Sequence, residues 1–197
     1  MTRNLIACAV AVLAGATCLS VPALAQDTRE WSQVGHWSIA VDPTLNNSCF
    51  ALNEYDDGTV LRIGLDLSDE GIWYIMFGND RWQSIEAGSD YDVSLKFDRE
   101  AEWNAIASGI DMGGGINFLY VFGSDVNFFD EFVRKNTLKL FYDGSTIAQL
   151  SLSGSARAIN AMLECQEAQD AAPPADPFAG KSKKKSGSKA GADPFAN

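Results

Sequence analysis

Apolar and polar residues alternate through most of the middle of the chain, which is the pattern of β-strands with one buried face. The alternating segments are residues 36–41, 49–53, 59–65, 91–97, 137–142 and 146–152, with a weaker one at 81–85. Residues 72–77 and 116–122 are apolar at nearly every position, as in central strands that are covered on both faces. Asp-Gly pairs at 57–58 and 143–144 lie between alternating segments and predict tight hairpin turns.

Two later segments have the periodicity of amphipathic helices. The first follows Ser124, a residue type that caps helices, and its apolar positions are Val126, Phe129, Phe132 and Val133. The second begins at Ser155, and its apolar stripe consists of Ala158, Ile159, Met162, Leu163 and Cys165. Residues 98–110 are ambiguous, because a helix-favouring start is followed by glycines. The sequence therefore predicts a mainly β (α+β) fold, with an antiparallel sheet or β-sandwich of about eight strands and two helices.

The first 25 residues have the three-part pattern of a secretory signal peptide. A short start with one arginine precedes an apolar run, and Ala23-Leu24-Ala25 offers small residues at the positions that a signal peptidase reads. A lipoprotein signal is the alternative, but the residues around Cys8 and Cys18 fit it poorly. We expect cleavage after Ala25 and a location in the periplasm or outside the cell. No later segment has 18 consecutive apolar residues, so we expect no transmembrane segment in the mature chain.

Removal of the signal peptide leaves two cysteines, Cys49 and Cys165. A single pair in an oxidising compartment is typical of a disulfide bond. A redox-active dithiol is the alternative, but the two residues form no Cys-x-x-Cys motif. We therefore expect a structural disulfide that holds the last helix against the strand containing Cys49.

Charge divides the rest of the chain into two parts. Residues 26–170 contain 24 acidic and 9 basic residues, a formal charge of −15, which argues against nucleic-acid binding. Residues 171–197 contain five lysines and two aspartates, a formal charge of +3, and are otherwise mostly Ala, Pro, Gly and Ser. Such a composition cannot bury enough apolar surface to fold. We expect a β-rich globular domain at 26–170 and a disordered, Lys-rich tail at 171–197.

The tail contains a near-repeat, in which Ala-Asp-Pro-Phe-Ala-Gly at 175–180 recurs as Ala-Asp-Pro-Phe-Ala-Asn at 192–197. The two motifs are Asp176, Pro177, Phe178 and Asp193, Pro194, Phe195, and the lysines between them are Lys181, Lys183, Lys184, Lys185 and Lys189. An aromatic side chain on a proline-stiffened turn is a common form of short linear motif. We hypothesise a bivalent arm that contacts a partner protein or an anionic envelope component. Drift in a low-complexity linker and electrostatic folding back onto the acidic domain are the alternatives.

Candidate catalytic and metal-binding residues are few. His36 is the only histidine, and its place beside Trp37 at a strand start favours a structural role over general-base catalysis. A zinc site would need more Cys or His ligands than the chain offers. Oxygen ligands alternate in the loop 66–71, but this loop lacks the length and the closing glutamate of an EF-hand. We therefore assign no catalytic residue, no metal and no cofactor.

Two of the five tryptophans are candidates for a binding site. Trp37 and Trp73 lie in strand patterns that predict burial in the core. Trp82 and Trp103 lie outside the clearest patterns, and with nearby acidic residues they would suit a glycan or a peptide. Burial of these two tryptophans in the core is the alternative.

The layout of the chain resembles that of the invasion-associated locus B family. The resemblance consists of the signal peptide, an early tryptophan-containing strand followed by a cysteine, and the strand-to-helix passage 150–158. Within that passage Ser155 stands where the family pattern has an aromatic residue. The resemblance implies a small, β-rich periplasmic protein of alphaproteobacteria, and it brings no catalytic residue.

We expect a non-enzymatic interaction or binding protein of the bacterial cell envelope, periplasmic or secreted. The reasons are the signal peptide and the missing set of catalytic residues. The alternative is an envelope hydrolase that uses a carboxylate pair, because a domain with 24 acidic residues does not exclude such a pair.

Overall fold

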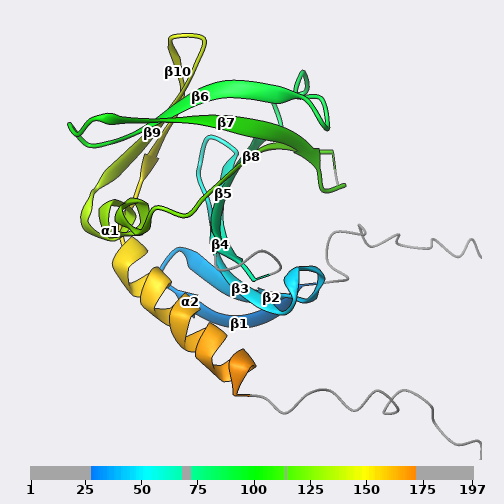
Figure 1. Cartoon of the computed structure of the whole chain (residues 1–197), viewed down its shortest axis with the longest axis vertical. Helices are drawn as coiled ribbons and strands as arrows, with labels where there is room; N and C mark the ends of the chain where they lie inside the picture. Colours follow the sequence, from blue (N-terminus) through cyan, green and yellow to red (C-terminus); the bar gives the residue numbers. More distant parts are fainter. Residues whose placement is uncertain (1–27, 68–71, 114, 172–197) are drawn as a thin grey trace, which may run out of the picture.

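Ten β-strands and two α-helices form the computed structural model, which describes residues 28–67, 72–113 and 115–171 (Figure 1). The strands are β1 (Arg29–Val34), β2 (Trp37–Asp42), β3 (Ser48–Glu54), β4 (Thr59–Asp66), β5 (Ile72–Asn79), β6 (Asp90–Phe97), β7 (Glu102–Asp111), β8 (Asn117–Gly123), β9 (Thr137–Tyr142) and β10 (Ser145–Ser151). The helices are α1 (Val126–Arg134) and α2 (Ser155–Asp170), and a short 3-10 helix, η2 (Pro43–Leu45), follows β2. All ten strands belong to one antiparallel sheet in the order β1-β2-β3-β4-β5-β8-β7-β6-β9-β10. The predicted mainly β fold with two helices is confirmed.

The sheet curves strongly, with β6 and β7 at the top of Figure 1, β1 to β3 at the bottom and β8, β5 and β4 between them. This curvature brings its two ends together. The indole N–H of Trp37 in β2 donates a hydrogen bond to the carbonyl of Ser153, just after β10 (3.0 Å). The hydroxyl of Tyr55, just after β3, donates to the carbonyl of Ser151 at the end of β10 (2.9 Å). Inward-facing residues of the rolled sheet therefore share one core.

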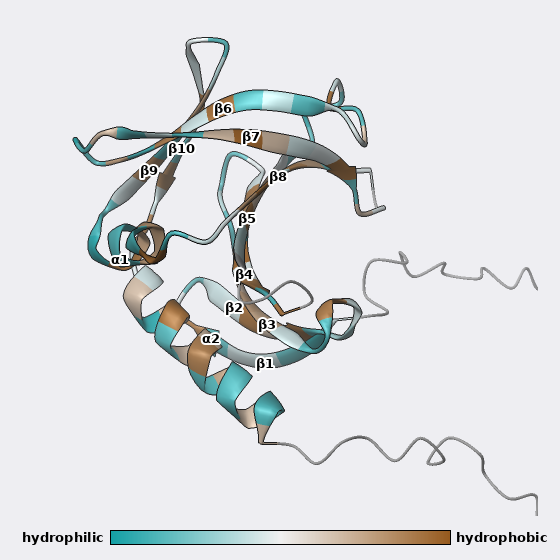
Figure 2. Ribbon diagram, viewed as in Figure 1, coloured by the Kyte–Doolittle hydropathy of each residue, from teal (hydrophilic) through white to brown (hydrophobic). Residues whose placement is uncertain are grey.

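The core consists of the positions at which the sequence alternates. Leu61 pairs with Phe77 and Ile63 with Ile75, and all four side chains are fully buried. A slip of one residue would turn them outward, so burial fixes the register. Figure 2 shows the hydrophobic residues along β4 and β5 and in the middle of α2.

Both helices cover the core, although the predicted face of α1 is partly wrong. Phe128 and Phe132 are buried, whereas Val126 is 75% exposed. Phe128 stacks on Trp73 with 4.0 Å between ring centroids, so an aromatic contact from the sheet decides which side of the helix turns inward. In α2 the predicted stripe is buried except for Leu163.

The cap of α1 also differs from the prediction. The side chain of Asp125, rather than that of Ser124, accepts a hydrogen bond from the backbone N–H of Asn127 (2.9 Å). An aspartate at this position also complements the positive end of the helix dipole.

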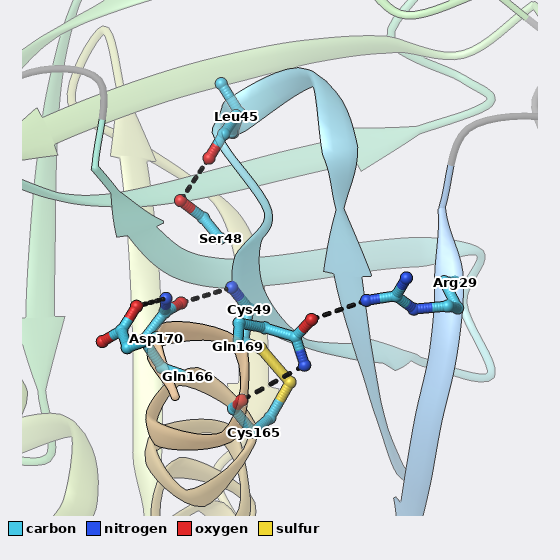
Figure 3. The surroundings of a disulfide bond; sticks show 8 residues. All are labelled: Arg29, Leu45, Ser48, Cys49, Cys165, Gln166, Gln169 and Asp170. Carbon is cyan, nitrogen blue, oxygen red and sulfur yellow. Dashed lines mark hydrogen bonds between the residues drawn. A yellow bond between two sulfur atoms is a disulfide. The ribbon is translucent and has the colours of Figure 1, made fainter. Parts of the chain in front are cut away.

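The predicted disulfide between Cys49 and Cys165 is present and ties α2 to β3 (Figure 3). The side-chain oxygen of Gln166 accepts a hydrogen bond from the backbone N–H of Cys49 (2.8 Å), next to the disulfide. The guanidinium of Arg29 in β1 donates to the side chain of Gln169 (2.6 Å). One face of α2 is thus fastened to β1 and β3 by covalent and polar contacts.

Three stretches differ from the predicted strands. Residues 81–85 form turns, because the backbone N–H of Trp82 bonds to Asn79 and that of Ile85 bonds to Trp82. β1 is an exposed edge strand without apolar alternation, so no periodicity predicts it. β7 pairs with β6 and β8, and this pairing outweighs the helical preference of residues 99–102. No helix within the described residues is both long enough and apolar enough to span a membrane.

Candidate functional site

A recess of about 290 Å³ opens between the β5–β6 connection and the β9–β10 hairpin. We call it the mouth recess. Its polar lining residues are Arg81 and Ser84, and its apolar and aromatic ones are Trp82, Ile85, Tyr91, Leu119, Tyr142 and Ile147. They come from strands far apart in the sequence, which the rolled sheet brings together where these strands end.

Hydrogen bonds hold the loop that forms one wall of the mouth recess. The carbonyl of Asn79, the last residue of β5, accepts from the N–H of Trp82 (3.0 Å). The side-chain amide of Asn117 in β8 donates to the carbonyl of Ile85 (2.9 Å). The loop is therefore tied to two strands.

Two tyrosines form the opposite wall. The rings of Tyr91 and Tyr142 meet edge to face with 5.8 Å between centroids. The hydroxyl of Tyr91 accepts from the backbone N–H of Glu86 (2.8 Å), which fixes its ring. Tyr142 is 42% exposed, so its ring is accessible to a ligand. This lining suits an apolar or aromatic side chain.

Arg81 carries the only charge in the lining of the mouth recess, and much of it is already engaged. Its Nε donates to the side-chain oxygen of Asn79 (3.1 Å), and its terminal nitrogen donates to the carbonyl of Asp57 (3.1 Å). The Asp57 carboxylate lies 4.0 Å from the same guanidinium. Arg81 therefore braces the loop, while its side chain remains 68% exposed.

An acidic groove of about 660 Å³ lies on the other face of β6 and β9. Successive side chains of a strand point to opposite faces of the sheet. In β6, Tyr91 therefore faces the mouth recess and Asp92 lines the groove. In β9, Tyr142 faces the mouth recess and Phe141 lines the groove. Its carboxylates are Asp92, Glu102 and Asp143, of which Glu102 is paired with Lys96 (3.2 Å). Ile106, also in the lining, is 61% exposed. An apolar recess and an acidic groove thus lie on either side of one hairpin.

Both tryptophans singled out from the sequence line recesses. Trp82 belongs to the mouth recess, and Trp103 belongs to a second recess between β7 and β8. Each is half-buried and packs against the core, as the core interpretation expects, and a binding role for either stays a prediction. The sequence did not predict that Tyr91 and Tyr142 share a site, because only the pairing of β6 with β9 makes them neighbours.

A buried ion pair lies on the outward face of β2 and β4. A terminal nitrogen of Arg62 is 2.5 Å from Asp42, and its Nε donates to the hydroxyl of Tyr74 (2.8 Å). The guanidinium also lies 3.8 Å from the ring centroid of Phe50. Burial opposes ionisation of Asp42, but hydrogen bonds from Arg62 and Thr44 and the positive charge of Arg62 outweigh it and lower the pKa of this carboxyl. The enclosed, fully charged pair has a structural role.

Two carboxyl groups in the described part of the chain have a lowered pKa. The pKa of Asp42 is lowered, and that of Asp57 is lowered by the backbone N–H of Thr59 and by the charge of Arg81. His36 is exposed in the turn between β1 and β2. No group of three or more His, Cys, Asp or Glu side chains in the described part of the chain is arranged to hold a metal ion.

Several sequence predictions fall outside the described residues. These are the signal peptide, most of the loop 66–71, and the tail with its motif residues Asp176, Pro177, Phe178, Asp193, Pro194 and Phe195 and its lysines Lys181, Lys183, Lys184, Lys185 and Lys189. They stay predictions.

Comparisons with protein-family models, curated proteins and solved structures find no match to this chain.

Proposed function

We propose that this protein is a non-enzymatic binding protein of the bacterial cell envelope, periplasmic or secreted, which holds a basic segment of a partner protein by an aromatic side chain. The observation that carries the proposal is the mouth recess, a ready-made, largely apolar hollow with the half-exposed ring of Tyr142 at its edge. Aromatic side chains in such hollows anchor many protein–protein contacts.

An apolar side chain fits the mouth recess better than a sugar ring does. A sugar needs several convergent polar groups to match its hydroxyls. Arg81 is bound to Asn79 and Asp57, and the hydroxyl of Tyr91 is bound to Glu86. For a ligand rich in hydroxyl groups the lining offers few polar groups, chiefly the remaining N–H groups of Arg81 and the hydroxyl of Ser84.

The acidic groove favours a cationic partner. A segment that crosses the β9–β10 hairpin would meet the mouth recess on one side and Asp92 and Asp143 on the other. The net charge of −15 on residues 26–170 is negative, like that of the acidic groove, and would steer basic segments toward the domain.

The compartment and the family resemblance are part of the same proposal. A disulfide between Cys49 and Cys165 is compatible with an extracytoplasmic location, where such bonds persist. A signal peptide at 1–25 and a likeness to the invasion-associated locus B family would agree with that location.

Selection of a displayed random-peptide library on the mature chain, from Gln26 onward, tests this function. We expect enriched peptides to combine lysine or arginine with an aromatic residue. Tyr142→Ala should weaken binding of one such synthetic peptide about tenfold or more, because it removes a wall of the mouth recess. Added salt should weaken it further by screening the groove carboxylates.

Trp31→Ala is the matched control, because Trp31 is an aromatic residue of similar exposure on the edge strand β1, at the other end of the molecule (Figure 1). It should leave the affinity unchanged. Equal binding by wild type and Tyr142→Ala would overturn the proposal. So would exclusive binding, or turnover, of peptidoglycan fragments, which would favour the hydrolase alternative instead.

A further inference from the structure

β7 and β8 separate towards one end, and a slot lies between them. Their pairing stops at Ser108 and Tyr120, although β7 extends back to Glu102 and β8 extends on to Gly123. The slot has a volume of about 230 Å³. The two strands still pair with β6 and β5 on their other sides, so the frame around the slot is fixed.

Aromatic rings form the slot. Trp73 and Phe128 stack at its base, and Trp103 meets Phe128 edge to face with 5.7 Å between centroids. Phe122 stands at the opening and is 57% exposed. The indole N–H groups are already used, since Trp73 donates to Asp125 and Trp103 to Glu131 (3.0 and 3.1 Å). The open space is thus apolar and suits one further aromatic ring.

We propose that this slot binds the chain's own distal Asp-Pro-Phe motif, with the ring of Phe195 seated against Trp103 and Ala105. The tail supplies an aromatic side chain next to a proline, which limits the conformational entropy lost on binding. This contact is separate from the mouth recess and does not depend on the function proposed there.

The reach of the tail selects the distal motif. Ser155, the first residue of α2, donates to the carbonyl of Phe132 in α1, so α2 starts beside the helix that lines the slot. α2 has 16 residues and is therefore roughly 24 Å long, and it runs away from α1 (Figure 1), so the tail begins about one helix length from this start. Phe178 is seven residues beyond Ala171 and reaches about 24 Å only when fully extended. Phe195 is 24 residues beyond Ala171, and a flexible segment of that length spans about 24–29 Å on average.

Charge favours the same path. α2 presents the exposed carboxylates of Glu164 and Glu167 along its length, while Asp130 of α1 is already paired with Arg134 (3.2 Å). Asp125 lies at the rim of the slot itself. The lysines at 181–189 stand in the middle of the 24-residue span and would lie over these acids. At working concentrations an intramolecular contact of this length is favoured over one between copies, because its effective concentration is on the order of millimolar.

Photo-crosslinking of the full mature chain tests the proposal. Phe195 is replaced by p-benzoylphenylalanine, and the cross-linked positions are mapped by mass spectrometry after irradiation. We expect cross-links to β7 and to the β8–α1 connection, within one chain. The same replacement at Phe178 is the matched control, because the motif is the same but its seven-residue tether must be fully extended to span that distance. Cross-linking to the slot should be at least about fivefold lower from that position.

Two further measurements keep the result decisive. Ala105→Phe fills the slot, so it should abolish the cross-link from position 195, while a thermal unfolding curve verifies that the variant is folded. A mixture of heavy- and light-isotope chains should give cross-links only between peptides of the same label. Cross-links spread over the domain, directed to the mouth recess, equal from both positions, or joining heavy to light chains would each overturn the proposal.

Discussion

Arg62 is a buried charged residue, and its contacts offset the free energy of removing its charge from water. Its guanidinium is enclosed between Asp42, the hydroxyl of Tyr74 and the ring of Phe50. Removal of one partner of such a pair leaves an uncompensated buried charge, which costs far more than the pair contributes. Asp42 also accepts from both the backbone and the side chain of Thr44, so it organises the start of η2 as well.

Asp42→Asn should lower the free energy of unfolding by about 3–5 kcal/mol at neutral pH, because it leaves the buried Arg62 without its counter-charge. Urea unfolding measures this loss. The double variant Asp42→Asn with Arg62→Met should recover much of it, since no charge is then buried unpaired. A double variant no more stable than the single one would contradict this explanation.

The same pair predicts a response to acid. The pKa of Asp42 is lower in the folded protein than its ordinary value of 3.8. The unfolded chain therefore takes up protons first as the pH falls, so the stabilisation is complete above pH 3.8 and is lost below it. Unfolding free energies measured from neutral pH into the acid range should fall more steeply for wild type than for Asp42→Asn. Parallel curves would be the contrary result.

Gly78 offers a second residue-scale test. A Cβ at this position would lie 2.4 Å from the ring of Phe118, which covers the glycine from the neighbouring strand. Gly78→Ala should therefore destabilise the fold by about 1–3 kcal/mol through overpacking. In a Phe118→Ala background the same change should be neutral or stabilising, because alanine suits a strand better than glycine. A double-mutant cycle in urea measures this coupling, and strict additivity would argue against it.

At the scale of elements, α2 closes the fold. It touches β1, β2 and β3, and it is held by the Cys49–Cys165 disulfide and by Gln166. Because β10 leads directly into it, α2 also connects the two ends of the rolled sheet.

Cys165→Ser should lower the unfolding free energy by about 2–5 kcal/mol, the usual effect of removing a native disulfide from a small domain. Intact mass of the non-reduced wild type should be two hydrogens below the fully reduced mass. Wild type measured in reductant serves as the control and should match the variant. Two free thiols in the purified protein, or equal stability of variant and oxidised wild type, would be the opposite outcome.

Local signals explain which elements were predictable from the sequence. The hairpin β9–β10 follows from alternation around an Asp-Gly turn, and the disulfide follows from an isolated cysteine pair. β1 has no apolar alternation because it is an exposed edge, and β7 is decided by pairing with distant strands. The mouth recess was foreseen only through Trp82, since Tyr91 and Tyr142 become neighbours through a contact between β6 and β9 that no local pattern encodes.

At the scale of the whole molecule, the arrangement is one sheet with its two ends joined by a helix. The two recesses lie where the rolled sheet is interrupted. The mouth recess lies between the β5–β6 connection and the β9–β10 hairpin, and the slot lies between β7 and β8. The binding sites that we propose thus lie at places where the sheet does not close on itself.

Because α2 covers the first strands, the core cannot close until this last helix has been synthesised. A chain made from its N-terminus has β1 to β3 ready long before Cys165 emerges, and until then the inner face of these strands lacks its cover. Contacts of such long sequence separation slow folding. A chain ended at Gly154 should remain sensitive to protease and should bind a hydrophobic dye, whereas one ended at Ala171 should resist and not bind it. Resistance of the shorter chain would show that the sheet folds without the helix, whereas sensitivity would show that the fold forms only after α2 has been made.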